Sequence, residues 1–312
     1  MKVGLITGLG ASRSPFWERL LRELGMELSL PSLPFEQVYE LGRASLPNEP
    51  AHVQLLLGRV LELERSDLVL LPGLLPVAQD AWGEALGELL PRRLSGLPPM
   101  QTLPAGVPAP GETGDEAALL AAAAELGQRL TRNPARVRLA LDRSRPLARP
   151  PRPTFPLMER AGRQTVAVLG QPALLADPDL SAPLRAHLEG LGLHPVFGTE
   201  LPQEQVWERA GRFDPGEGAA PPAGQRWLNG VQGLLEGRSA VRGLLYVFPR
   251  RDLAWERALT RMTARARKPQ RLLGLDPGSQ DWSPLEGFGG ELDSGGRAAQ
   301  PPHAGLSHKE QA

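Results

Sequence analysis

Short apolar runs that alternate with helix-forming segments constrain the fold of this chain more than any other feature. Residues 2–7 form one such run, which leads into a Gly-rich turn and then into apolar residues at helical spacing. The pattern starts again at residues 165–170, ahead of a predicted helix over 180–191. Parallel strands joined by helices produce this alternation. The sequence therefore predicts an α/β protein with two parallel-sheet domains.

The positions of proline, glycine and alanine indicate where these domains end. We expect an N-terminal α/β domain over 1–106, a helical and Pro-rich connector over 107–153, and a C-terminal α/β domain over 154–275. The connector combines an Ala-rich stretch with the run Arg149–Pro153, which cannot continue a helix. Residues 276–312 contain few apolar side chains, and we expect most of them to form a disordered tail.

Further elements follow from the same patterns. Strands are expected over 26–30, 67–71, 193–197, 243–248 and 271–275. Helices are expected over 53–63, 82–89, 116–130, 133–147, 227–235 and 252–265. The Pro- and Gly-rich residues 96–114 are expected to be a loop that closes the first domain.

Charge and cysteine content exclude several classes of protein. The 35 basic residues balance the 35 acidic ones, so no net positive field draws the chain to nucleic acid or to an anionic membrane. There is no cysteine, which removes disulfides, thiolate nucleophiles and cysteine-ligated zinc or iron. The 5 histidines show no metal-binding spacing, and we predict no metal site. Without a signal peptide or a long apolar segment, a cytoplasmic location is expected.

Several short motifs, taken in order, carry a resemblance to a known family. The resemblance covers roughly residues 1–275, and the motifs that carry it are Lys2–Leu5, Ser14–Trp17, Gln54–Val60, Ser66–Leu71, Ser95–Met100 and Val166–Pro202. Together they resemble proteins related to the subunits of 2-hydroxyacyl-CoA dehydratase and benzoyl-CoA reductase. The nearest branch is the domain family (DUF2229) found with, or fused to, the ATP-dependent activase of those enzymes. The resemblance implies two Rossmann-like domains that face each other across a cleft, where cysteines ligate an iron–sulfur cluster.

The chain departs from this family at the positions of the implied cysteines. The corresponding stretches read Pro47–His52, Pro91–Arg93 and Pro249–Asp252. Because these side chains cannot replace sulfur ligands on iron, we expect no cluster and no other cofactor. The function implied is a non-redox homologue, a scaffold that binds a partner or a small anionic ligand. Two alternatives stay open: a non-redox enzyme acting on a CoA thioester or nucleotide-like ligand, and a regulatory or assembly subunit for an activase-like ATPase in a separate chain.

The first candidate ligand contacts lie between the first predicted strand and helix. Gly8, Gly10, Ser12 and Arg13 are placed where backbone N–H groups at a helix N-terminus can bind a phosphate. The dinucleotide fingerprint is incomplete, since Arg13 stands at its third glycine position. A tight turn without a ligand is the alternative.

Further candidates follow strands of the second domain. Gly170 and Gln171 end its first strand and occupy the position that matches the first loop. Arg250 and Arg251 follow another buried strand and can bind a phosphate or carboxylate with two hydrogen bonds. Asp252, the next residue in the chain, is the last of the candidate ligand contacts. A strand-ending turn at 170–171 and a helix cap at Asp252 are the structural alternatives.

Catalytic residues are not assigned by the sequence. Glu49 and His52, near one lost cysteine position, are weak candidates for an acid–base pair, although polar residues in such a loop are usually just solvated. Ligands bind parallel α/β sheets beyond the carboxyl ends of the strands. We therefore expect the loops 8–13, 170–172 and 249–252 to converge between the domains.

Overall fold

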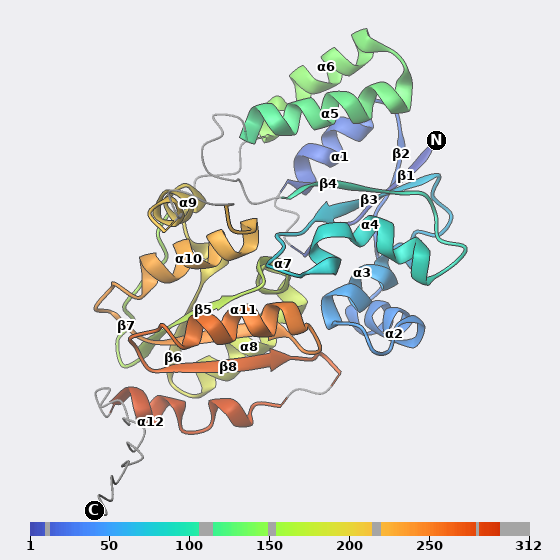
Figure 1. The fold of residues 1–312 in the computed structure, drawn as a ribbon. Helices are drawn as coiled ribbons and strands as arrows, with labels where there is room; N and C mark the ends of the chain where they lie inside the picture. The colour runs from blue at the N-terminus through green and yellow to red at the C-terminus, as the bar shows by residue number, and fades with distance from the viewer. Residues whose placement is uncertain (10–12, 106–114, 149–153, 214–219, 279–280, 294–312) are drawn as a thin grey trace, which may run out of the picture.

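A computed structural model describes residues 1–9, 13–105, 115–148, 154–213, 220–278 and 281–293. It contains two parallel sheets of four strands each, with helices packed around them (Figure 1). The prediction of an α/β protein with two parallel sheets is confirmed. We refer to residues 1–148 as the N-terminal half and to residues 154–293 as the C-terminal half.

The N-terminal half is built on a sheet with the strand order β2-β1-β3-β4. Its strands are β1 (Lys2–Leu5), β2 (Glu27–Ser29), β3 (Leu68–Gly73) and β4 (Met100–Ala105). Its helices are α1 (Ser14–Glu23), α2 (Phe35–Ser45), α3 (Ala51–Glu62), α4 (Ala81–Arg93), α5 (Asp115–Thr131) and α6 (Pro134–Ser144), followed by the 3-10 turn η1 (Arg145–Leu147). All neighbouring strands are parallel, so every connection crosses over through helices.

The C-terminal half repeats this arrangement with the order β6-β5-β7-β8, again all parallel. Its strands are β5 (Gln164–Gly170), β6 (Leu193–Phe197), β7 (Val241–Pro249) and β8 (Gln270–Leu275). Its helices are α7 (Pro172–Ala176), α8 (Pro178–Gly190), α9 (Gln203–Gly211), α10 (Ala223–Leu235), α11 (Leu253–Thr263) and α12 (Phe288–Asp293), with the 3-10 turns η2 (Gly198–Glu200) and η3 (Ser283–Leu285). In both halves the second strand lies on one side of the first strand and the third strand on the other.

Alternating apolar residues of the central strands supply both faces of each sheet. In β5, Val166 and Val168 belong to one buried cluster, while Ala167 and Leu169 belong to another. The first of these clusters also contains Val69 of the N-terminal half, so apolar packing continues from one half into the other. The halves are therefore packed against each other where the family resemblance implies a cleft.

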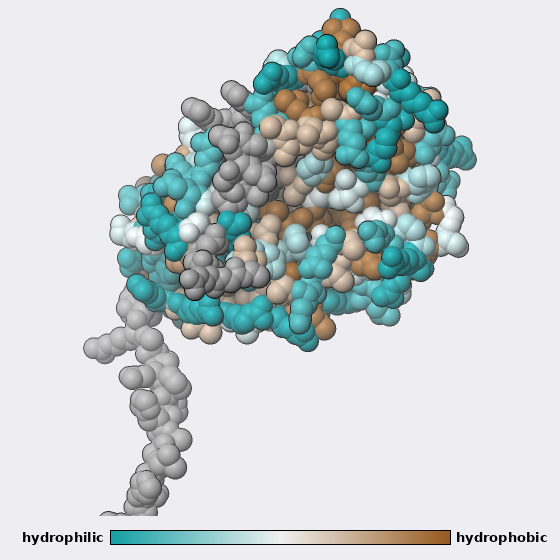
Figure 2. Space-filling view, turned by 45° about the horizontal axis from the view of Figure 1, so that its top comes forward, coloured by the Kyte–Doolittle hydropathy of each residue, from teal (hydrophilic) through white to brown (hydrophobic). Residues whose placement is uncertain are grey.

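Hydrophilic and apolar residues are interspersed over the face shown in Figure 2. Hydrophilic residues line most of its lower rim, and apolar residues are visible in smaller groups between them. Within the described part of the chain, no helix has both the length and the hydrophobicity needed to cross a membrane.

The predicted connector helices exist, but they cover the first sheet. Leu119 and Leu126 of α5 and Val137 of α6 share a buried cluster with Val3 and Phe16. In Figure 1 both helices lie beside α1, at the top of the N-terminal half. They are a layer of this half rather than a link between two domains. The Pro-rich run at 149–153 lies outside the described residues.

Two further expectations are corrected by the structure. The segment expected to be a closing loop contains the edge strand β4, which pairs with β3. The predicted tail contains η3 and α12, whose side chains Leu285, Phe288 and Leu292 are at most 2% exposed. These three residues recur every three or four positions and cover one face of the second sheet together with α8. The tail prediction is wrong for 281–293, and residues 294–312 lie outside the described part.

Candidate functional site

Loops at the carboxyl ends of the two sheets contact the opposite half of the molecule. We call this region the junction, and define it by the turns after β1, β3, β5 and β7, by His52 and Arg59 of α3 (Ala51–Glu62), and by Asp177 between α7 and α8. Asp177 is fully buried, caps α8 through the N–H of Asp179 at 3.1 Å, and also reaches the N-terminal half. There its Oδ2 accepts hydrogen bonds from the N–H of Leu9 and the guanidinium of Arg59, both at 3.3 Å.

A second contact joins α3 to the turn after β5. The ring Nε2 of His52 lies 3.4 Å from the amide nitrogen of Gln171, and both residues are at most 1% exposed. Burial lowers the pKa of His52 to about 3, so the ring is neutral at physiological pH and its Nε2 accepts this hydrogen bond. Within the described residues, His52 Nδ1 and Gln171 Oε1 are buried without a hydrogen-bond partner.

The turns after β3 and β7 have the same construction. Asp80 caps α4 by accepting the N–H of Gly83 at 2.8 Å, and Asp252 caps α11 by accepting the N–H of Trp255 at 3.1 Å. The residue before each cap has a left-handed backbone, with φ of 66° at Gln79 and 73° at Arg251. Asp252 is therefore a helix cap, as one of the two interpretations of the sequence predicts.

The two capping carboxylates interact across the junction. The indole N–H of Trp255 donates to Asp80 Oδ2 at 3.0 Å, so α11 binds the cap of α4 directly. Asp252 Oδ2 is buried and has no hydrogen-bond partner among the described residues. Burial raises the pKa of Asp252 to about 7, and the charge of Asp80 adds to this shift. Burial raises the pKa of Asp80 as well, although the hydrogen bonds from Gly83 and Trp255 act to lower it.

The predicted glycines serve close packing. Gly8 has φ of 93°, and a Cβ there would lie 3.0 Å from both Arg59 and the Asp177 carboxylate. A Cβ at Gly170 would lie 2.1 Å from the carbonyl oxygen of Val247 on the neighbouring strand. Both positions therefore require glycine for a structural reason: Gly8 for its turn, and Gly170 for the close approach of β7.

The remaining predicted ligand contacts, in the first loop and after β7, differ in how far they are exposed. Arg13 is 4% exposed and precedes α1, and burial lowers its pKa. Gly10 and Ser12 lie outside the described residues. Arg250 and Arg251 are exposed, and the Arg251 guanidinium donates to the carbonyl oxygen of Pro47 in the N-terminal half.

The proposed acid–base pair of Glu49 and His52 is not formed. Glu49 accepts a hydrogen bond from the indole of Trp82 at 2.8 Å, whereas His52 faces Gln171. Asp80 and Arg59 were not predicted to have a role, although both hold the junction together. One signal was present for Asp80: each half places an aspartate two or three residues before a tryptophan after its third strand.

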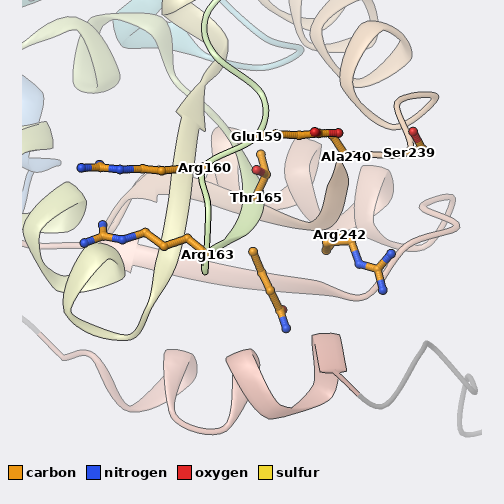
Figure 3. Close-up of a pocket in the computed structure, with 8 residues that line it drawn as sticks. Glu159, Arg160, Arg163, Thr165, Ser239, Ala240 and Arg242 are labelled. Carbon is orange, nitrogen blue, oxygen red and sulfur yellow. The ribbon is translucent and has the colours of Figure 1, made fainter.

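A pocket of about 430 Å³ lies elsewhere, at the amino ends of β5 and β7 (Figure 3). It is lined by three arginines, but Figure 3 shows Arg160 and Arg163 extending in one direction and Arg242 in another. Arg160 and Arg163 lie 3.9 and 4.0 Å from Glu189 of α8. Because the three guanidinium groups do not converge, this pocket lacks the geometry of an anion site. Nor do the described residues contain a cluster of three or more His, Asp or Glu suited to a metal ion.

Neither the protein-family models nor the curated proteins include a match to this chain. The family resemblance therefore rests on the motifs alone.

Proposed function

We propose that this protein is a two-lobed scaffold that binds a small ligand between two Rossmann-like halves. We propose further that it is a divergent, non-redox homologue of the 2-hydroxyacyl-CoA dehydratase type. The repeated strand order supports the first part, because each sheet changes direction of strand addition next to its first strand. Ligands of open α/β sheets bind beyond the carboxyl ends of the strands at this point. The two sets of carboxyl-end turns contact each other through the junction.

The observation that carries the proposal is a set of buried polar atoms with unused hydrogen-bonding capacity. His52 Nδ1, Gln171 Oε1 and Asp252 Oδ2 all lie at the junction and are without partners among the described residues. Buried polar groups are almost always hydrogen-bonded, because an unmatched one costs about 1–3 kcal/mol. Several such groups on one interface are expected where a ligand completes the hydrogen bonds.

The experiment is a thermal-shift screen of the full chain against CoA esters and nucleotides, repeated with Gln171→Leu. This change removes the buried amide at the junction while keeping a side chain of similar size. Gln232→Leu on α10 is the matched control outside the junction. A ligand that raises the melting temperature of the parent and the control, but not of Gln171→Leu, supports the proposal. Equal shifts in all three proteins would place the ligand elsewhere, and no shift with any compound would contradict a site of this class.

A second function, a non-redox enzyme on the same class of ligand, is favoured by one observation. A carboxyl group with a pKa of about 7, such as Asp252, can both give and take a proton at neutral pH. If Asp252 acts on a bound ligand, Asp252→Asn should abolish turnover of a CoA thioester while the thermal shift by that ligand persists. Retained turnover in the folded variant would exclude this role.

A further inference from the structure

The turn after β1 holds a carboxylate that belongs to the other half. Asp177 Oδ2 accepts from the Leu9 N–H and from Arg59, each at 3.3 Å. The consecutive positive φ values of 93° at Gly8 and 48° at Leu9 give this turn a concave backbone. Successive N–H groups in such a turn form an anion-binding concavity. The Arg59 guanidinium also donates to the carbonyl oxygen of Thr7, which fixes it beside the turn.

Asp177 is a poorly matched occupant of this position. Charge-assisted hydrogen bonds are usually about 2.7–2.9 Å long, shorter than either bond that its Oδ2 makes here. The side chain is fully buried, and burial raises the pKa of Asp177 even though Arg59 acts to lower it. Its Oδ2 has therefore given up hydration that the Leu9 N–H and Arg59 only partly replace. Its displacement by a better-matched anion would return it to water.

We propose that the Leu9 N–H and Arg59 form a subsite for the phosphate group of a small-molecule ligand, and that Asp177 occupies this subsite as a built-in competitor when the two halves are together. A phosphate has more acceptor oxygens than a carboxylate and is bound by backbone N–H groups together with a planar guanidinium. Entry of the phosphate withdraws Asp177 and separates α8 from the turn after β1. The inference deepens the proposed function and rests on it for the rest of the ligand.

The test measures binding of inorganic phosphate to the full chain by titration calorimetry. Asp177→Ala removes the competitor and is expected to bind phosphate about tenfold or more tightly than the parent, the effect of one charge-assisted hydrogen bond. Adding Arg59→Gln to this variant should remove the gain. Asp179→Ala is the matched control, because it makes the same change in net charge at an exposed position of the same helix. It is expected to bind phosphate like the parent.

Asp177→Asn serves as the second variant, since asparagine can still cap α8 and only the charge is lost. Equal gains in the Asp177 and Asp179 variants would reduce the effect to net charge and overturn the proposal. A gain that survives Arg59→Gln would place the phosphate elsewhere, and folded Asp177 variants that do not bind phosphate would overturn it as well. Failure of the proposed function looks different: the Asp177 variants would bind phosphate in an Arg59-dependent way, while no CoA ester or nucleotide stabilises the parent.

Discussion

The turns after β3 and β7 are nearly the same in backbone and differ in how their carboxylates are completed. In each turn a left-handed residue precedes an aspartate that caps the next helix. The second oxygen of Asp80 accepts the indole N–H of Trp255, whereas the second oxygen of Asp252 has no partner among the described residues. A carboxylate that keeps a donor retains its charge more easily than one that loses water without replacement. Burial raises the pKa of both aspartates, and the indole of Trp255 lowers that of Asp80 alone.

The outer layers of the two halves differ more than the turns do. The N-terminal sheet is covered by α5 and α6, two regular helices whose alanine and leucine content signals them in the sequence. The C-terminal sheet is covered in part by η3 and α12, which contribute only Leu285, Phe288 and Leu292 to the core. Only three apolar side chains of η3 and α12 therefore cover this face of the sheet. The loss of any one of them is expected to cost more stability than the loss of one apolar residue of α5 or α6.

The largest effect is expected when this cover is removed. A chain that ends at Leu275 should be less stable than one that ends at Asp293 by at least about 4 kcal/mol, since loss of one buried Phe alone costs about 3–5 kcal/mol. The truncation also removes Asp276, which accepts a hydrogen bond from Tyr39 of α2 at 3.0 Å. Urea denaturation of both chains measures the difference. Equal midpoints would show that α12 contributes nothing to the C-terminal half.

The asymmetry of the two carboxylates should be visible as a dependence of stability on pH. The pKa of Asp252 is raised from 3.8 to about 7, so its stabilising contribution is complete below pH 4 and is lost as the pH rises to about 7. Asp252→Asn, which retains the cap, should therefore gain about 4 kcal/mol of unfolding free energy relative to the parent between these limits. Thermal denaturation at several pH values tests this.

His52 provides the opposite dependence for comparison. Its pKa is lowered from 6.5 to about 3, so its contribution is complete above pH 6.5 and is lost as the pH falls toward 3. His52→Gln should therefore gain stability relative to the parent as the pH falls. Two difference profiles of the same sign would contradict the assignment of either group.

A smaller effect is expected from the tryptophan that creates the asymmetry. Trp255→Phe keeps the ring in the core but leaves Asp80 Oδ2 without its donor, which should cost about 1–3 kcal/mol. Trp82→Phe is the matched change in the other half, where the indole donates to the half-buried Glu49. Because water can replace that bond, the cost should stay below about 1 kcal/mol. Equal costs in urea denaturation would mean that the two turns are energetically equivalent after all.

The central strands were predictable because a buried parallel strand needs a continuous apolar run. The strands β1, β3, β5 and β7 are such runs, and α3, α5, α10 and α11 show helical spacing beside them. The edge strand β4 was missed because Pro104 lies within it, which an edge position tolerates. The turn η3 and the short helix α12 were missed because their three apolar residues, Leu285, Phe288 and Leu292, can be recognised as core residues only when the sheet that they cover is known.

The location of the junction was predictable in outline, but its contacts were not. The turns after β1, β5 and β7 were placed by the general behaviour of parallel sheets, and each of them reaches the opposite half. Their partners are distant in sequence: 118 positions separate Arg59 from Asp177, and 175 separate Asp80 from Trp255. Such pairings depend on how the two sheets pack, and local patterns hold no information about them.

The smallest expected effect concerns the left-handed residues of the two turns, Gln79 and Arg251. The left-handed backbone conformation destabilises a residue with a Cβ by about 1–2 kcal/mol, and glycine avoids this cost. Part of the gain is lost, because glycine loses more conformational entropy on folding. Gln79→Gly, at an exposed position, should therefore stabilise the protein by about 0.5–1 kcal/mol. Arg251→Gly removes the same backbone strain, but it also removes the hydrogen bond from the guanidinium to the carbonyl oxygen of Pro47. The two effects oppose each other, so the free energy of unfolding should change little. Chemical denaturation gives both values, and hydrogen exchange around residue 47 should increase in Arg251→Gly alone. If both variants gain equally, the bond to Pro47 contributes nothing to the junction, and the two turns differ only in their carboxylates.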